Sequence, residues 1–224
     1  MILLLYLLLN MNSKIIVKPR VTTYLYLLIL LCYAFCHIDN GIIAVSNETI
    51  KKSLNITESE VGLIATGLYI GNVAGSIVTP LIFAKLNTKL IIVLSAIFNA
   101  LAVSVFALVT NYWVIFGSRI LVGFFQVMFV IYFPVWIDIC APPEKQTMWI
   151  SFFFLTVPIG IILGYGLTVF FTTFTDYQYT FLVQTALMLV PISLFFAIIP
   201  ARYYQKSEQT QHNDDGNQSA PIIE

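Results

Sequence analysis

The sequence predicts an all-α integral membrane protein with six transmembrane helices. Of the 224 residues, 59% are hydrophobic and only 10% are charged, and the mean hydropathy is +0.89. Soluble domains carry about 25% charged residues. Six apolar runs are long enough to cross a bilayer, which takes about 20 helical residues. They form a domain over 21–204, between a short segment, 1–20, and a polar tail, 205–224, that we expect to be disordered. The runs cover residues 21–45, 60–84, 90–110, 112–140, 148–171 and 179–199.

The basic residues predict the orientation of these helices. Loops on the cytoplasmic side of a membrane are enriched in Lys and Arg. Most basic residues lie on the side of the two termini, so we expect both termini to be cytoplasmic. The formal net charge of zero argues against a nucleic-acid partner. On the side of the termini lie Lys14, Lys18, Arg20, Lys85, Lys89, Lys145, Arg202 and Lys206, and on the opposite side lie Lys51 and Lys52.

The first run carries a charged residue inside the membrane, Asp39, followed by Asn40. An intramembrane acid is a functional hypothesis by default. Cys32, Cys36 and Asp39 recur at helical spacing, as the ligands of a soft metal site would. The sequence has no second cluster of ligands, so we expect a polar lining there and no metal.

Residues 46–60 are predicted to form a polar loop on the side opposite the termini. Asn47 and Asn55 each begin a glycosylation sequon in this loop, and we predict that both are glycosylated. Thr57 and Glu60 have the spacing of a capping box, which marks the start of the second helix.

The second helix carries a ridge of small residues, Gly67, Gly71 and Gly75, one helical turn apart. Such a ridge lets another helix approach closely. The simplest interpretation is helix packing within the protein, and the alternative is a docking surface for another protein.

The fourth run contains Arg119 inside an otherwise apolar stretch, and Gln126 returns to the same helix face seven residues later. A central arginine costs roughly 2.5–3.5 kcal/mol to insert. We therefore expect a buried binding or coupling site with an acidic or anionic partner; the alternative is an arginine that extends to the lipid headgroups.

The fifth run contains Pro158, Gly160 and Gly164, which are expected to bend the helix, as happens where transporter helices line a substrate path. The alternative is a tolerated kink without a role in function. The sixth run ends at Pro200 and Arg202.

Between Tyr24 and Phe171 the chain resembles the N-terminal six-helix half of a major facilitator superfamily transporter, and most of all its spinster-like branch. The resemblance lies in the order and spacing of four segments: HIDNGIIAV in the first helix, SRILVG and FPVWIDICAPPEKQ in the fourth, and VPIGIILGYGLT in the fifth. It implies a transporter that works by alternating access, without a cofactor, on an organic anion or a lipid-like amphiphile.

The resemblance also implies roles for the charged residues. Asp39 would take up and release a proton, and Arg119 would bind either that carboxylate or an anionic substrate. The chain departs from the family where Ala84 replaces an aspartate, Gln126 a glutamate and Asn40 an arginine. Asp39 is then the remaining acid in the bundle interior.

The chain supplies one six-helix half, whereas transporters of this superfamily move two halves about a central site. We therefore expect a second half: a missing C-terminal half, a second copy or another subunit. We also expect that translation starts at Met11, and that the sequence comes from a split or truncated gene. The alternative function is a non-transporting membrane interaction subunit; an enzyme is not expected, because no paired acids or activated nucleophile are found. The resemblance implies the plasma membrane or an endolysosomal or vacuolar membrane.

Overall fold

The computed structural model describes residues 19–85, 88–173 and 176–198, and within them every regular element is a helix. The predicted terminal segments therefore lie outside the described residues, apart from Pro19 and Arg20, which begin the first helix. The helices are α2 (Pro19–Cys36), α3 (Ile38–Leu54), α4 (Glu58–Lys85), α5 (Thr88–Leu108), α6 (Tyr112–Cys140), α7 (Gln146–Thr172) and α8 (Tyr177–Ile198).

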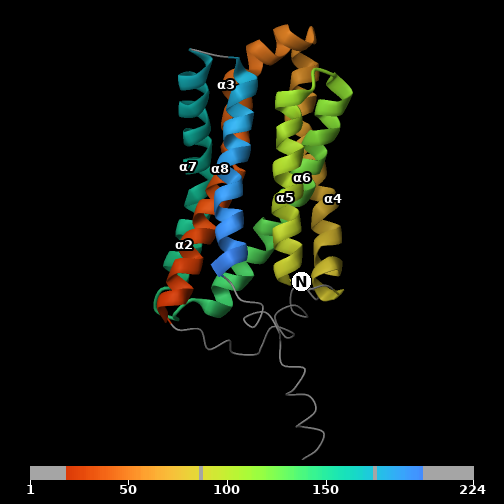
Figure 1. The fold of residues 1–224 in the computed structure, drawn as a ribbon. Coiled ribbons are helices and arrows are strands. Elements are labelled where there is room, and N and C mark those ends of the chain that lie inside the picture. Colours follow the sequence, from red (N-terminus) through yellow and green to blue (C-terminus); the bar gives the residue numbers. More distant parts are fainter. Residues whose placement is uncertain (1–18, 86–87, 174–175, 199–224) are drawn as a thin grey trace, which may run out of the picture.

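The seven helices form six upright columns, because α3 continues the column of α2 after a break at His37 (Figure 1). Five segments of the described chain, with α2 and α3 counted together, are long and apolar enough to cross a membrane. The sixth column is α8, whose 22 residues include no Asp, Glu, Lys or Arg. The start of α2 and the end of α8 lie at the same end of the bundle. The predicted all-α, six-helix membrane fold is confirmed.

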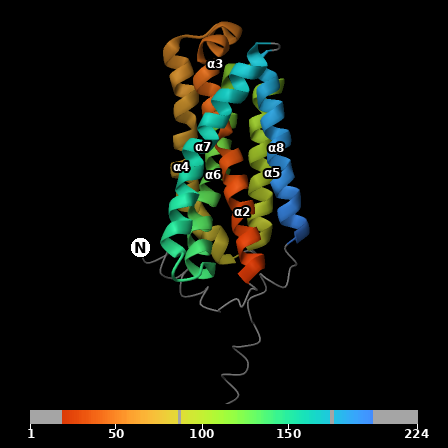
Figure 2. The same ribbon diagram turned by 90° about the vertical axis from the view of Figure 1, so that its left-hand side faces the viewer.

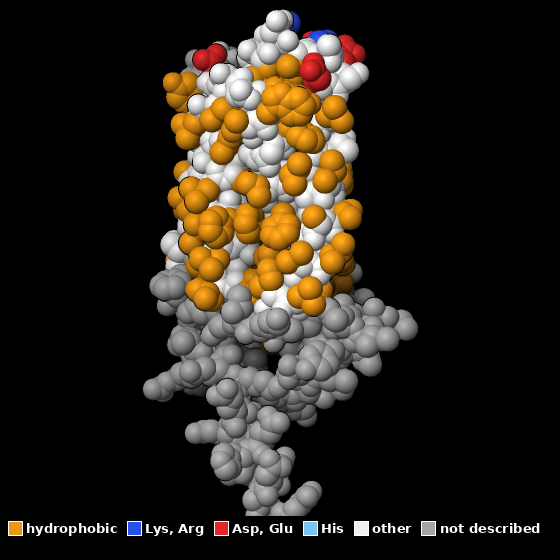
Figure 3. All heavy atoms as spheres, turned by 90° about the vertical axis from the view of Figure 1, so that its right-hand side faces the viewer, with side chains coloured by type: hydrophobic (Ala, Val, Ile, Leu, Met, Phe, Trp, Pro, Cys, Tyr) orange, Lys and Arg blue, Asp and Glu red, His pale blue; other side chains and the backbone are white. Residues whose placement is uncertain are grey.

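The outer surface of the bundle is apolar along its middle. On the face in Figure 3, hydrophobic side chains cover most of the length, and the charged side chains visible there lie only at one end. Ile77 on α4 and Leu101 on α5 are 67% and 56% exposed. A surface of this kind is stable against lipid, so the protein is a multi-pass membrane protein.

Helices α4 and α6 pack with their backbones nearly in contact. A Cβ added to Gly71 on α4 would collide with the backbone carbonyl of Ile120 on α6, and one added to Gly123 on α6 would collide with the carbonyl of Leu68. The rest of the glycine ridge faces the same helix: Gly67 lies against Arg119 and Phe116, and Gly75 against Phe124 and Val127. This packing fixes the depth at which α6 presents Arg119.

Helices α3 and α7 repeat this arrangement on the other side of the bundle (Figure 1), the side that faces the viewer in Figure 2. Gly41 on α3 lies against the carbonyl of Ile161, and Gly164 on α7 lies against the carbonyl of Ile38. Pro158 lies inside α7, which runs without interruption from Gln146 to Thr172. These two glycine contacts bring the backbones of α3 and α7 as close together as those of α4 and α6.

The connection between α3 and α4 differs from the predicted polar loop over 46–60. Residues 46–54 belong to α3 and residues 58–60 begin α4, so that expectation is wrong except for residues 55–57. The helix ends at Leu54, and its C-terminal cap Asn55 has a left-handed backbone with φ 51°. A change from apolar to polar residues predicts where the chain leaves the membrane, but it does not predict where the helix ends. A helix continues into water when its polar residues have sufficient helix propensity.

The predicted capping box is confirmed. The Thr57 backbone N–H donates to Glu60 Oε2 at 2.7 Å, and the Glu60 N–H donates to Thr57 Oγ1 at 3.4 Å. Each side chain therefore satisfies a backbone donor of the other residue at the start of α4.

Glycosylation tests which end of the bundle faces the lumen or the outside. Asn47 and Asn55 are exposed, at the end opposite the start of α2. We expect Asn47→Gln combined with Asn55→Gln to increase the mobility of the protein on a denaturing gel, because two glycans are lost. Asn217→Gln, which removes the sequon of the predicted cytoplasmic tail, is the control and is expected to leave mobility unchanged. An unchanged band in the double variant would contradict the predicted orientation.

Candidate functional site

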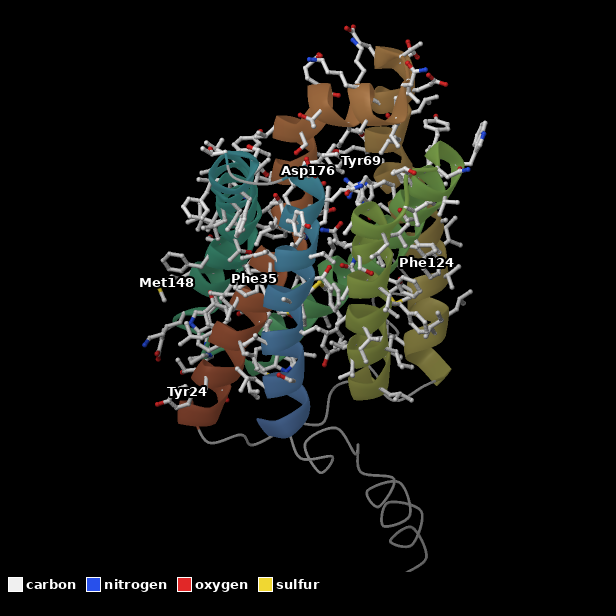
Figure 4. All side chains as sticks on the ribbon, turned by 45° about the horizontal axis from the view of Figure 1, so that its top comes forward. Tyr24, Phe35, Tyr69, Phe124, Met148 and Asp176 are labelled. Carbon is white, nitrogen blue, oxygen red and sulfur yellow. The ribbon has the colours of Figure 1, made fainter. Side chains whose placement is uncertain are left out.

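The site begins at the break between α2 and α3. A helix that ends inside a membrane leaves carbonyl groups that need a hydrogen-bond donor. Here the Ala34 carbonyl accepts from the His37 backbone N–H at 3.1 Å. The Cys36 carbonyl accepts from Gln126 Nε2 on α6 at 3.0 Å, and the Phe35 carbonyl from Gln184 Nε2 on α8 at 3.3 Å. Phe35 lies on α2 near α8 (Figure 4). Two glutamine side chains therefore stabilise the interrupted helix.

A buried ion pair lies directly after the break. Arg119 Nη1 on α6 donates to Asp39 Oδ2 on α3, and the two side chains are 2% and 0% exposed. Arg119 Nη2 donates to Asn40 Oδ1 at 3.1 Å. The guanidinium carbon also lies 5.8 Å from the centre of the Phe106 ring, a cation–π contact. The structure thus pairs the two intramembrane charges that the sequence singled out, 80 residues apart.

His37 contacts both a residue that stabilises the break, Gln126, and a residue that binds the ion pair, Asn40. Its Nδ1 lies 3.1 Å from Gln126 Nε2 and 3.3 Å from Asn40 Nδ2. Its ring meets the Tyr33 ring edge to face, with the centroids 4.7 Å apart. The imidazole is therefore surrounded by the same residues that hold the carbonyl of Cys36 and the guanidinium of Arg119.

Several polar atoms of this cluster are buried without a hydrogen-bond partner among the described residues. A buried polar atom usually has a partner, so each of these can engage water, a proton or a ligand. They supply both acceptors and donors around one ion pair. The atoms are Asp39 Oδ1, Gln126 Oε1, Arg119 Nε and His37 Nε2.

All four residues predicted as the substrate or coupling site, Asp39, Asn40, Arg119 and Gln126, meet at this cluster. The break separates Cys36 on α2 from Asp39 on α3, and the described residues contain no group of His, Cys, Asp and Glu that could hold a metal. Ala84 and Lys85 fall where side chains lie outside the described part of the chain.

Sequence reasoning missed two members of the cluster, His37 and Gln184. Gln184 is 0% exposed and stands in an apolar helix, VQTALM, so the criterion that found Arg119 and Gln126 would also have found it. His37 lies two residues before Asp39, but no sequence pattern predicts that the helix is interrupted there.

Removing the Gln184 amide is expected to destabilise the break. In Gln184→Leu the Phe35 carbonyl loses its donor, and we expect the free energy of unfolding to fall by about 1–3 kcal/mol. Denaturation in detergent micelles measures this change. Gln178→Leu on the same helix is the matched control, because no side-chain hydrogen bond of Gln178 occurs within the described residues of the chain. Equal stability of both variants would contradict the role of Gln184.

Comparison with known proteins places this arrangement in a family. A family model described as Major Facilitator Superfamily matches residues 29–224. The chain is 24% identical over 151 residues to the probable sphingolipid transporter spinster homolog 1 of Arabidopsis thaliana, covering 67% of this chain and 31% of that protein. It is 26% identical over 168 residues to spinster homolog 3 of the same plant, covering 74% of this chain and again 31% of the relative. The chain thus spans about a third of the curated relatives it matches.

The fold matches solved structures with the same architecture. An inward-open structure of the xylose transporter XylE from E. coli superposes with a TM-score of 0.71 at 16% identity, covering 88% of this chain and 53% of that one. The proton:xylose symporter XylE bound to 6-bromo-6-deoxy-D-glucose gives a TM-score of 0.68 at 16% identity, covering 91% and 49%. The six helices therefore have the fold of about half of such a transporter.

The family match covers most of the chain, the fold neighbours share its architecture, and its curated relatives are spinster homologs. The chain belongs to the major facilitator superfamily and is related to its spinster-like members.

Proposed function

We propose that this chain is one half of a transporter that moves a lipid-like amphiphile with an anionic headgroup by alternating access, with a proton as the coupled ion. The observation that carries the proposal is the buried Asp39–Arg119 pair beside the break in the first column. The sphingolipid transporter names of the curated relatives support an amphiphilic cargo. An organic anion without a lipid tail is the second class of cargo.

The ion pair provides an exchange reaction. An anionic headgroup competes with Asp39 for the Arg119 guanidinium, and a carboxylate left without its cation in a dry interior is stabilised by taking up a proton. When the anion leaves, Asp39 releases the proton and pairs with Arg119 again. Asp39 Oδ1 and Arg119 Nε are buried without a partner in the described chain, which leaves a position for the proton and a donor for the anion.

A second six-helix half is part of this proposal. Asn40 contacts Arg119 but is only half-buried, so the site reaches the surface of the bundle there. Lipid tails offer no hydrogen bonds to a polar group at that surface, whereas a second half would cover it and complete the cavity. The second half is either part of the same polypeptide, another copy or another subunit.

Transport by the protein in membrane vesicles tests the cargo. We expect uptake of a radiolabelled long-chain-base phosphate and no uptake of xylose, which serves as the control cargo. Uptake of xylose alone would contradict the proposed cargo class but would support the proposed transport activity. If the inserted protein moves neither compound, the alternative function, a membrane interaction subunit without transport, is favoured.

We also propose that both termini are cytoplasmic and that the protein lies in the plasma membrane or an endolysosomal membrane.

The native size of the protein tests the second half. We expect an antibody against residues 46–60 to detect either a polypeptide of about twice the 25.3 kDa of this chain on a denaturing gel, or a complex of that size after crosslinking. A band at 25.3 kDa that crosslinks to nothing would contradict the requirement for a second half.

A further inference from the structure

The orientation of two side-chain amides around His37 is determined by their other partners. Gln126 donates to the Cys36 carbonyl, and a carbonyl oxygen only accepts, so the atom involved is the amide nitrogen. Asn40 accepts from Arg119 Nη2, and a guanidinium only donates, so the atom involved is the amide oxygen. The atom that each amide turns toward His37 is therefore its nitrogen, which is a donor.

These two donors determine where His37 carries its proton. Both amide nitrogens point to Nδ1, at 3.1 Å and 3.3 Å. A neutral imidazole has one acceptor nitrogen and one N–H donor. Because Nδ1 receives two donors it must be the acceptor, so the proton of neutral His37 is on Nε2. Nε2 is buried and has no hydrogen-bond partner among the described residues.

The charged and titratable groups around His37 come from three helices. Tyr33 and Cys36 lie on α2, Asp39 on α3 and Arg119 on α6. Helix α7 packs against His37 through Gly160, and neither α7 nor α8 contains an acidic, basic or histidine residue. Asp39 and Arg119 are paired with each other, so the uncharged imidazole disturbs no ion pair.

We propose that His37 is the positioning residue of this site. Its unprotonated Nδ1 accepts hydrogen bonds from the Asn40 and Gln126 amides, and a second proton taken up at Nδ1 breaks both bonds. Protonation turns Nδ1 from an acceptor into a donor, which then faces two N–H groups. The Asn40 amide turns away and no longer holds Arg119 Nη2. The Gln126 amide turns away and no longer holds the Cys36 carbonyl.

Protonation of His37 thus removes two hydrogen bonds together: one to Arg119 and one to the carbonyl of Cys36 at the break between α2 and α3. The guanidinium keeps its bond to Asp39 but loses its second partner, so an incoming anion meets an arginine that is freer to move. This consequence for transport rests on the proposed function. The proton position and the release of the two amides rest on the described hydrogen bonds alone.

Nitrogen NMR of the full chain in lipid nanodiscs tests the proposal. The protein has only 2 histidines, His37 and His212, so His212→Gln assigns the signals of His37. In neutral buffer we expect a bonded proton on Nε2 and none on Nδ1. The arginines are Arg20, Arg119 and Arg202, so selective arginine labelling with Arg119→Lys as reference identifies the guanidinium of interest. Its two Nη signals should be distinct in neutral buffer, because Asp39 and Asn40 hold one each.

On acidification we expect His37 to become doubly protonated and the Arg119 Nη2 signal to move over the same pH interval, because Nη2 loses Asn40, while Nη1, which keeps its bond to Asp39, changes less. Two variants separate this effect from general loosening. His37→Asn places an amide oxygen near the former Nδ1, an acceptor that takes no proton there, so the Nη2 signal should stay in place over the interval in which it moves in the wild type. His37→Leu removes the acceptor, so the Nη2 signal should already be displaced in neutral buffer.

A proton on Nδ1 in neutral buffer would overturn the proposal, as would an Arg119 Nη2 signal that stays in place while His37 titrates. Signals that behave alike in His37→Asn and His37→Leu would overturn it too. None of these measurements depends on transport activity. A protein that moves no cargo would refute the proposed function and leave the role of His37 standing, whereas a wrong proton position would leave the transport proposal standing.

Discussion

Arg119→Ala is expected to destabilise the folded bundle by about 3–5 kcal/mol, the loss found when one partner of a buried ion pair is removed. The reason is that Asp39 is 0% exposed and would lose its cation, so the folded state would bury either an unpaired carboxylate or a carboxyl group that has taken up a proton. Asn40 would lose its arginine donor as well. Denaturant or thermal unfolding of the purified protein in micelles measures the change.

A double variant separates the charge from the packing. Asp39→Leu combined with Arg119→Met removes both charges and keeps apolar volume, so we expect it to recover most of the lost stability. Lys145→Ala, at an exposed basic residue, is the control and is expected to stay within about 0.5 kcal/mol of the wild type. An Arg119→Ala protein as stable as the wild type would contradict a buried pair.

Gly71→Ala is expected to separate α4 from α6, because the new Cβ would collide with the Ile120 carbonyl. A backbone atom cannot rotate away as a side chain does, so the helices must move apart. Overpacking of this kind costs about 1–3 kcal/mol, and we expect the ion pair to be displaced with α6. Unfolding in micelles measures the loss.

The matched control for this prediction lies on the same helix. A Cβ on Gly62 meets nothing within 4 Å. Alanine has a higher helix propensity than glycine by about 0.8–1 kcal/mol, so Gly62→Ala is expected to leave the protein equally or more stable. Equal effects of the two substitutions would show that α4 and α6 are not in close backbone contact.

The fold was predictable because membrane helices leave strong local signals. The fourth helix runs over 112–140 as expected, since Asn111 caps its start: Asn111 Oδ1 accepts from the Trp113 N–H at 3.0 Å. Pro142 and Pro143 follow its end. The first helix was predicted less well, because its polar extension to Leu54 resembles a loop in composition.

The centre of the site was predictable in part. Arg119 and Asp39 stand out because a charge in an apolar run needs a partner. The break at His37 could not be predicted, since no proline or glycine occurs at 35–37 and the interruption depends on residues distant in sequence. Gly160 lies against the Ala34 carbonyl, and Gln126 and Gln184 bind the next two carbonyls. Such contacts become visible only when α6, α7 and α8 are placed against α2.

Transport by the Asp39→Asn protein tests the central claim most directly. Asparagine keeps an oxygen that accepts from Arg119 but cannot exchange a proton, so we expect the protein to insert normally and to move no cargo in vesicles with a proton gradient. Asp138→Asn, at an exposed aspartate near the end of α6, is the control and is expected to transport like the wild type. Arg119→Ala, measured beside them, is expected to lose transport too. Unchanged flux in Asp39→Asn and Arg119→Ala would contradict the assignment of this ion pair to coupling.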